Sequence, residues 1–272
     1  MKTSKQRLVH LLFFIITLGI LYPILFIISN SFKPLKEAYN TILNLIPQNF
    51  TLDNFTYLFK NLPLLEITWN TFFVATVITV VKLIIAFFAA YSFTYYRIKG
   101  KKTIYFLIIS TLFIPFTASM IPNYLLIAQL NLIDTSWGVI LPQLADAMGI
   151  FLLTQTMRGI PVSLLEVAEI DNISQWTIMR KIVFPLSRHA ITSTGIWFFI
   201  TSWNEFVWPV LILKSTERYT LPLAMQTYIS SEGGTNFTVA MSISLITMIV
   251  PLLLYTLFQK YIIGTFISTG IK

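Results

Sequence analysis

Three ionisable side chains, Lys82, Asp146 and Glu205, lie inside or beside long apolar segments of this 272-residue chain. Because an ionised group is costly to remove from water, such residues usually face a cavity or a partner of opposite charge. Trp203 and Asn204 directly precede Glu205, so hydrogen-bonding groups adjoin a flat aromatic face. This combination suits a ligand with hydroxyl groups and an apolar ring face, such as a sugar. The plainer alternative is that Lys82 pairs with one of the acids and that the tryptophan marks an interface.

Lys82 has a second interpretation, since a cation within an apolar segment could attract a solute that carries phosphate. The sequence offers little for catalysis or metal binding. It has no cysteine, and its two histidines, His10 and His189, are far apart in the sequence. We therefore expect neither catalytic nor metal-ligating residues, which argues against a membrane enzyme.

The composition predicts an all-α membrane protein. Hydrophobic residues make up 56% of the chain and charged residues 11%, whereas soluble domains average about 25% charged. Each of six apolar segments has roughly 20 residues or more, enough to cross a membrane. These segments lie near 8–30, 69–95, 103–122, 137–157, 189–213 and 237–259. We expect one transmembrane domain over 1–272, with a first span at 8–30 retained as a signal anchor, and a five-span core at 69–259.

The basic residues are distributed unevenly between the loops, which predicts the orientation in the membrane. Thirteen of the nineteen fall on one side, namely Lys2, Lys5, Arg7, Arg97, Lys99, Lys101, Lys102, Arg158, Arg180, Lys181, Arg188, Lys260 and Lys272. Both termini are then cytoplasmic. The net charge of +8 thus reflects topology, and the alternative, a basic patch for RNA, is disfavoured. On the outer side, 32–68 is expected to form a turn and one or two short surface helices.

A polar segment from Glu166 to Arg188 interrupts the apolar pattern, within a predicted cytoplasmic loop at 158–188. Ser163 and Glu166 have the spacing of a capping box, which predicts a helix start. Asn172 tolerates a left-handed conformation and is expected to end that helix, and Ser174 is expected to cap a second one. Two short helices at an angle could fill a groove on a partner protein, or they could lie on lipid.

Several motifs, in order along the chain, resemble those of bacterial ABC-importer permeases. The resemblance is carried by Glu166-Val167-Ala168, Asp171-Asn172 and Ile182–Leu186 (the EAA loop), by Trp203–Pro209 (a W-N-x-F-x-W-P block), and by Leu130–Thr135, Leu141-Pro142, Tyr219–Pro222, Gln259–Tyr261 and Ser268–Lys272. The tryptophan block is similar to that of the carbohydrate branch, which includes permeases of maltose and glycerol-3-phosphate importers. The chain departs from the pattern at Asn172, where the family has glycine, at Ile173, and at Val167, where it has alanine.

The resemblance implies a multi-pass permease of a bacterial-type plasma (inner) membrane. It would form one translocation path with a second permease, above an ATP-hydrolysing dimer, and receive a sugar or sugar-like solute from an extracytoplasmic binding protein. Glycerol 3-phosphate or a glycerophosphodiester is the alternative solute. Glu166, Val167, Ala168, Asp171 and Asn172 would couple the permease to the ATPase. The chain has no Walker A pattern, so the resemblance implies that ATP and magnesium bind to the partner. A secondary transporter or channel is the competing class, and it would not need the cytoplasmic helices.

Overall fold

The computed structural model describes residues 2–41, 43–229 and 236–268. Thr269–Lys272 of the C-terminal motif lie outside the described residues, as does the charge of Lys272. Contacts divide the chain into two compact units. Unit 1 comprises Met1–Thr68 and Thr220–Val250, and unit 2 comprises Trp69–Tyr219 and Pro251–Lys272.

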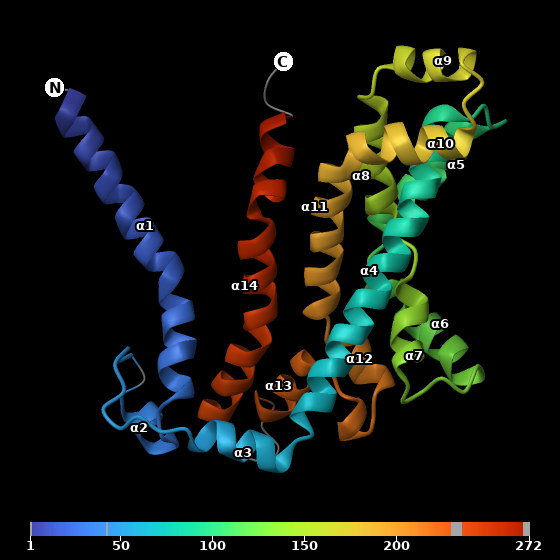
Figure 1. The fold of residues 1–272 in the computed structure, drawn as a ribbon. Coiled ribbons are helices and arrows are strands. Elements are labelled where there is room, and N and C mark those ends of the chain that lie inside the picture. The colour runs from blue at the N-terminus through green and yellow to red at the C-terminus, as the bar shows by residue number, and fades with distance from the viewer. Residues whose placement is uncertain (1, 42, 230–235, 269–272) are drawn as a thin grey trace. The chain divides into compact units, whose positions relative to one another are not determined.

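Unit 1 contains the long helix α1, three short helices and the first part of α14 (Figure 1). Their bounds are Lys2–Ser31 for α1, Leu35–Asn40 for α2, Asp53–Asn61 for α3, Leu221–Ile229 for α13 and Phe237–Ser268 for α14. The segment 32–68, for which one or two short helices were expected, contains two, α2 and α3. Asn54 connects the pieces, because its amide donates to the carbonyls of Ser31 (2.9 Å) and Lys33 (2.8 Å) and its oxygen accepts from Thr238 (2.9 Å).

Unit 2 is built around helices α4, α8 and α11, which run side by side (Figure 1). Its helices are α4 (Leu64–Tyr95, which begins in unit 1), α5 (Lys101–Ser110), α6 (Phe116–Gln129), α7 (Ser136–Ile140), α8 (Ala147–Arg158), α9 (Val162–Ile170), α10 (Gln175–Ile178), α11 (Phe184–Trp203) and α12 (Val207–Ile212). Three-residue 3₁₀ turns lie at Thr111–Phe113, Leu141–Gln143 and Thr216–Arg218, and a π-helical turn lies at Met179–Val183. Among the described residues no strand is found, which agrees with the predicted all-α class.

Three helical segments of the described chain are long and apolar enough to cross a membrane on their own: Gln6–Ser31, Leu64–Tyr95 and Phe237–Lys260. Two bent pairs raise the number to five if each pair crosses as one span. In these pairs Lys101–Phe113 meets Phe116–Gln129 at 97°, and Ser136–Gln143 meets Ala147–Arg158 at 46°. The segment expected as a span at 189–213 is also divided, because α11 ends at Trp203 and α12 begins at Val207. The subdivision into a single domain with a first span and a five-span core stays a prediction.

The breaks coincide with residues that cannot continue a helix or that favour a new start. Pro115 has extended backbone angles and stands directly before α6. Proline lacks an N–H and its ring clashes with the preceding turn, so it does not continue the helical segment before it. Asp146 caps the first turn of α8 with its side chain. Hydropathy averages over about 20 residues and does not register such single-residue interruptions.

The turn before α7 is held to the end of α12 by one carboxylate. Asn131 and Asp134 both have left-handed backbones, with φ of 56° and 59°, which Asn and Asp tolerate better than other non-glycine residues. The Asp134 carboxylate accepts from the backbone of Lys214 (2.8 Å), and from the backbone (3.0 Å) and hydroxyl of Ser215. Burial acts to raise the pKa of Asp134, but these hydrogen bonds and nearby Arg218 outweigh it, so the pKa lies below its ordinary value.

We predict that Asp134→Asn lowers the free energy of unfolding by about 1–3 kcal/mol at neutral pH, as expected for hydrogen bonds to a charged group. The folded-state pKa is lowered. The stabilisation is therefore complete above the unfolded carboxyl pKa of about 3.9 and is lost as the pH falls through the folded-state value. Thermal unfolding in detergent as a function of pH measures this. Glu217→Gln, at an exposed carboxylate in the same region, should change little, and equal effects of the two variants at all pH values would contradict the prediction.

Candidate solute cavity and coupling loop

A cavity of about 280 Å³ lies in unit 2 among α4, α6, α8 and α11. Its lining combines charged, hydroxyl, amide and aromatic side chains. These residues are Lys82, Phe116, Pro142, Gln143, Ala145, Asp146, Trp197, Thr201, Ser202 and Glu205. Three of the five residues predicted for a substrate path, Lys82, Asp146 and Glu205, therefore meet in one place, although 64 residues separate the first two along the chain.

The cavity lies where three apolar segments are broken. Phe116 is the first residue of α6, Asp146 is the cap of α8, and Glu205 follows the end of α11. In apolar surroundings, irregular backbone is tolerated only where it is buried in protein or lines a polar cavity, because its N–H and C=O groups need partners. The breaks therefore provide both the space and the polar groups of the site.

Lys82 and Asp146 form an ion pair, with 3.2 Å between Nζ and Oδ2 and with 12% and 22% of their side-chain surfaces exposed. The other carboxylate oxygen of Asp146 accepts from the backbone of Met148 (2.9 Å) and Gly149 (3.2 Å) at the start of α8. The Lys82 ammonium also lies 5.1 Å from the centre of the Phe198 ring. The pairing that the sequence left open is thus with Asp146, and the lysine charge is balanced within the fold.

Glu205 also serves the backbone, because its Oε1 accepts from the N–H groups of Val207 (2.8 Å) and Trp208 (3.2 Å) at the start of α12. The first N–H groups of a helix have no acceptor within the helix, so a carboxylate that accepts from them supplies the missing hydrogen bonds. Its negative charge also interacts favourably with the positive end of the helix dipole. Glu205 is also part of the cavity lining.

Two predicted residues do not line the cavity. Trp203 is fully buried and stacks on Phe199 with 5.7 Å between ring centres, so its face is covered by protein and is not offered to a solute as the sequence suggested. The Asn204 amide donates to the Ile200 carbonyl of its own helix (2.9 Å). Trp203 thus serves core packing, and Asn204 serves the C-terminal end of α11.

The sequence did not predict Trp197 and Thr201, which are among the aromatic and hydroxyl residues that do line the cavity. Trp197 is 41% exposed, whereas Trp203 and Trp208 are fully buried. Trp197, Thr201 and Glu205 are spaced by four residues, which places them on one face of a helix. This four-residue spacing is the sequence signal that indicates Trp197 and Thr201 as lining residues.

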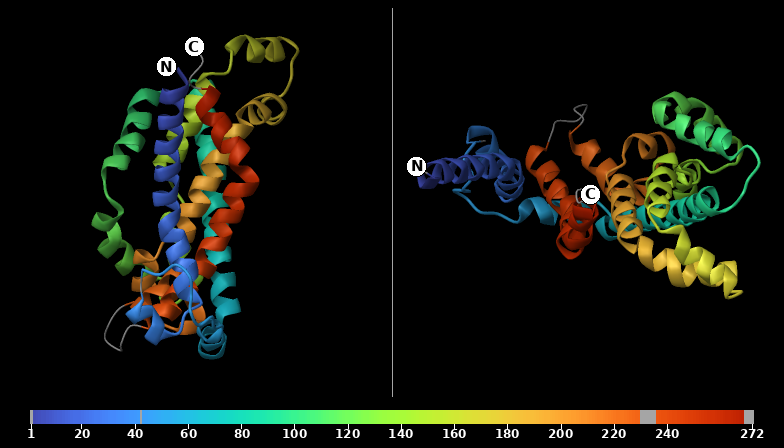
Figure 2. Two further views of the ribbon diagram at one scale, coloured as in Figure 1. Left: turned by 90° about the vertical axis from the view of Figure 1, so that its left-hand side faces the viewer. Right: turned by 90° about the horizontal axis from the view of Figure 1, so that it is seen from above.

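At the far end of unit 2 from α12, α9 lies across the ends of the longer helices and projects beyond them (Figures 1 and 2). Leu165 and Ala168 are buried and belong to the same hydrophobic cluster as Ala90 of α4 and Leu153 of α8. The opposite face exposes the predicted coupling residues Glu166 and Val167, together with the large apolar side chains Val162 (61% exposed) and Ile170 (77% exposed).

The backbone at both ends of α9 tests the local predictions. The capping box was wrong: α9 begins after Pro161 with no side-chain cap, so Ser163 already lies in the first turn. The left-handed turn at Asn172 is confirmed, with φ of 54°. Its N–H bonds to the Glu169 carbonyl and the N–H of Ile173 bonds to the Ala168 carbonyl, each at 3.0 Å, which is the Schellman pattern. Asp171, the C-cap of α9, is exposed.

The second helix is α10, and Ser174 caps it as predicted by accepting from the Thr177 N–H (3.3 Å). Gln175 fixes α10 to its neighbours, since it donates to Glu169 of α9 (3.2 Å) and accepts from the Tyr91 hydroxyl of α4 (2.9 Å). A π-helical turn then leads into α11, where Pro185 stands in the first turn. This proline stands at the start of the long helix, a position where its missing N–H costs nothing.

Comparison with known proteins identifies the family. Residues 82–265 match the family described as the binding-protein-dependent transport system inner membrane component. The chain belongs to this family. Similar permeases are the arabinooligosaccharides transport system permease AraQ of Halalkalibacterium halodurans (30% identical, covering 98% of this chain and 99% of AraQ) and of Bacillus subtilis (31%, covering 99% and 97%). The sn-glycerol-3-phosphate transport system permease UgpE of Brucella melitensis is 26% identical, covering 96% of this chain and 95% of UgpE.

The fold of the permease is that of a solved importer. It aligns with a chain of a bacterial ABC transporter involved in the import of the acidic polysaccharide alginate, with a TM-score of 0.82, 24% identity and coverage of 95% and 96% of the two chains. The protein is therefore a multi-pass membrane permease of an ABC importer. The roles of the individual cavity and loop residues stay predictions.

We predict that Asp146→Asn and Lys82→Met each destabilise the permease by about 1–3 kcal/mol, between the values for surface pairs and buried pairs, because each leaves an unbalanced charge. The double variant should recover part of this loss, since neither charge is then left alone. Thermal unfolding of the four proteins forms a double-mutant cycle. Additive effects would show that the ion pair contributes no coupling energy.

Proposed function

We propose that this permease forms, with a second permease, the membrane path of an ATP-driven importer, and that a sugar or oligosaccharide passes along the cavity between α4, α8 and α11. The observation that carries the sugar assignment is the lining itself. Gln143, Thr201 and Ser202 offer amide and hydroxyl groups, and Trp197 offers an exposed aromatic face within the same cavity. The sugar-transporting relatives AraQ support this assignment.

The charges in the cavity favour a neutral solute. Lys82 is paired with Asp146, so Glu205 is the ionisable lining residue without a charge partner there, and the formal charge of the lining is −1. An anionic solute would have to compete with Asp146 for the lysine or approach Glu205. The structure thereby argues against Lys82 as an attractor for phosphate, although UgpE relatives of similar coverage keep glycerol 3-phosphate, or a glycerophosphodiester, as the second candidate.

The proposal extends to the partners and to the orientation. α9 offers a half-apolar face with Glu166 and Asp171 exposed, which suits a groove on a separate ATPase dimer that binds ATP and magnesium. An extracytoplasmic binding protein would deliver the solute on the opposite side. We propose that α9 and both chain termini lie in the cytoplasm, as the distribution of basic residues predicts.

Co-purification and uptake test this proposal. The tagged permease should bring down a second permease and an ATPase, and reconstituted vesicles supplied with the cognate binding protein should take up a neutral oligosaccharide in an ATP-dependent manner. Uptake of glycerol 3-phosphate in preference to sugars would replace the solute assignment and leave the importer intact. Transport by the chain alone, driven by an ion gradient, would identify a secondary transporter and overturn the whole proposal.

We predict that Glu166→Lys or Asp171→Lys lowers binding-protein-stimulated ATPase activity and uptake by roughly tenfold or more, because like charges placed together at an interface cost several kcal/mol. Both side chains are exposed, so the thermal stability of the permease should change little. Glu217→Lys, an exposed reversal outside α9, serves as the control. Wild-type stimulation and uptake in both α9 variants would exclude them from coupling.

A further inference from the structure

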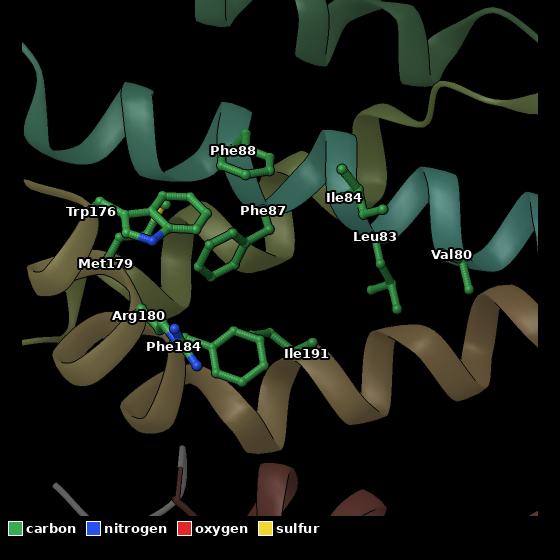
Figure 3. A pocket seen from close by; sticks show the side chains of 10 residues that line it. All are labelled: Val80, Leu83, Ile84, Phe87, Phe88, Trp176, Met179, Arg180, Phe184 and Ile191. Carbon is green, nitrogen blue, oxygen red and sulfur yellow. The ribbon is translucent and has the colours of Figure 1, made fainter.

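A second cavity, of about 510 Å³, opens between α4 and the α10–α11 segment and is separate from the solute cavity (Figure 3). On α4 it is lined by Ile84, Phe87 and Phe88, and on the other side by Trp176, Arg180 and Phe184. We call it the α4–α10 groove. Nine of the ten side chains that line it in Figure 3 are apolar or aromatic, and Arg180 supplies the charge.

The groove is a built feature of unit 2. Its floor is an edge-to-face pair of Phe87 and Phe184, with 5.8 Å between ring centres. Its α10 wall is fixed by the bond from the Tyr91 hydroxyl to Gln175, the residue before Trp176. The π-helical turn Met179–Val183 contains Arg180. Such turns widen the helix locally and are frequent at functional sites.

The groove has a polar end and an apolar end, which match the headgroup and the acyl chain of a phospholipid. Trp176 and Arg180 lie together at one end, and Val80 lies at the other (Figure 3). From residue 80 to residue 88, α4 rises about 12 Å, which gives an acyl chain a long apolar surface. Tryptophan and arginine are enriched where membrane meets water, and the guanidinium fork matches the geometry of a phosphate group.

A second transmembrane helix is the other conceivable occupant, and the lining disfavours it. Helices that pack closely in membranes meet through small residues such as Gly, Ala, Ser and Thr, and none of these lines the groove. Bulky side chains leave an irregular surface, to which a flexible acyl chain adapts more readily than a rigid helix. Charge complementarity with Arg180 further selects an anionic headgroup over a zwitterionic one.

We propose that the α4–α10 groove binds one anionic phospholipid, with an acyl chain along Val80–Phe88 and the headgroup phosphate on Arg180 beside Trp176. The bound lipid bridges α4 to the segment that joins the α9 loop to α11. This site goes beyond the transport function, since none of its residues lines the solute cavity.

Photolabelling of the purified transporter in nanodiscs tests the proposal. The probe is phosphatidylglycerol with a diazirine in one acyl chain, and adducts are mapped by peptide mass spectrometry. We expect labelling of the α4 and α10–α11 peptides that is displaced by unlabelled phosphatidylglycerol, but not by phosphatidylcholine or inorganic phosphate. Arg180→Gln should reduce it roughly fivefold, the factor for one basic residue at an anionic surface.

Two further variants make the result decisive. Lys181→Gln, the neighbouring cation that does not line the groove, should leave labelling unchanged, and Ile84→Trp should reduce it by filling the apolar part. Labelling that is equal in all variants, or equally displaced by phosphatidylcholine, would overturn the proposal. A photoreactive amino acid at position 84 that cross-links to another polypeptide instead of lipid would also overturn it and would assign the groove to a protein neighbour.

Discussion

The backbone groups released where helices break inside apolar segments must find hydrogen-bond partners, and much of unit 2 follows from this requirement. Asp146 provides for the first turn of α8 and Glu205 for the first turn of α12. Asp134 accepts in the same way from the backbone N–H groups of Lys214 and Ser215, which follow α12. Each of these three acids therefore stabilises a local backbone conformation, whatever its role in transport. Without them the breaks would leave unpaired N–H groups in surroundings that offer little water.

These capped breaks also explain why a polar cavity exists in so apolar a chain. A helix start that requires a carboxylate brings a charge with it, and that charge needs a partner or a polar environment. Lys82 supplies the partner for Asp146, while Glu205 faces the cavity. Hydroxyl and aromatic groups on the same face of α11 complete the lining. A structural necessity thereby leaves a mixed polar and aromatic surface of the kind that hydroxyl-rich solutes require.

The hydrophobic cluster of unit 2 connects this cavity to the exposed α9. Leu165 of α9 packs in the same cluster as Ala86 of α4 and Ile150 of α8. Ala86 is one helical turn from Lys82, and Ile150 is one turn from Asp146. The cluster is thus a continuous path of close-packed side chains from α9 to the two helices that carry the ion pair. The coupling proposed for α9 would use this path, because packed interiors deform little. The α4–α10 groove borders the same path, so its occupant would act on the same helices.

The sequence by itself determined the membrane class, the family and the local turns of the loop after α8. The left-handed Asn172 and the Ser174 cap were predicted correctly because each depends on backbone chemistry within a few residues. The capping box at Ser163 failed because Pro161 starts the helix earlier. Only the tertiary structure decided that Lys82 pairs with Asp146, that Trp197 and not Trp203 faces the cavity, and that three breaks converge there. Helical spacing groups Trp197 with Thr201 and Glu205, but it does not specify which segments meet. Those outcomes depend on contacts between segments far apart in the chain.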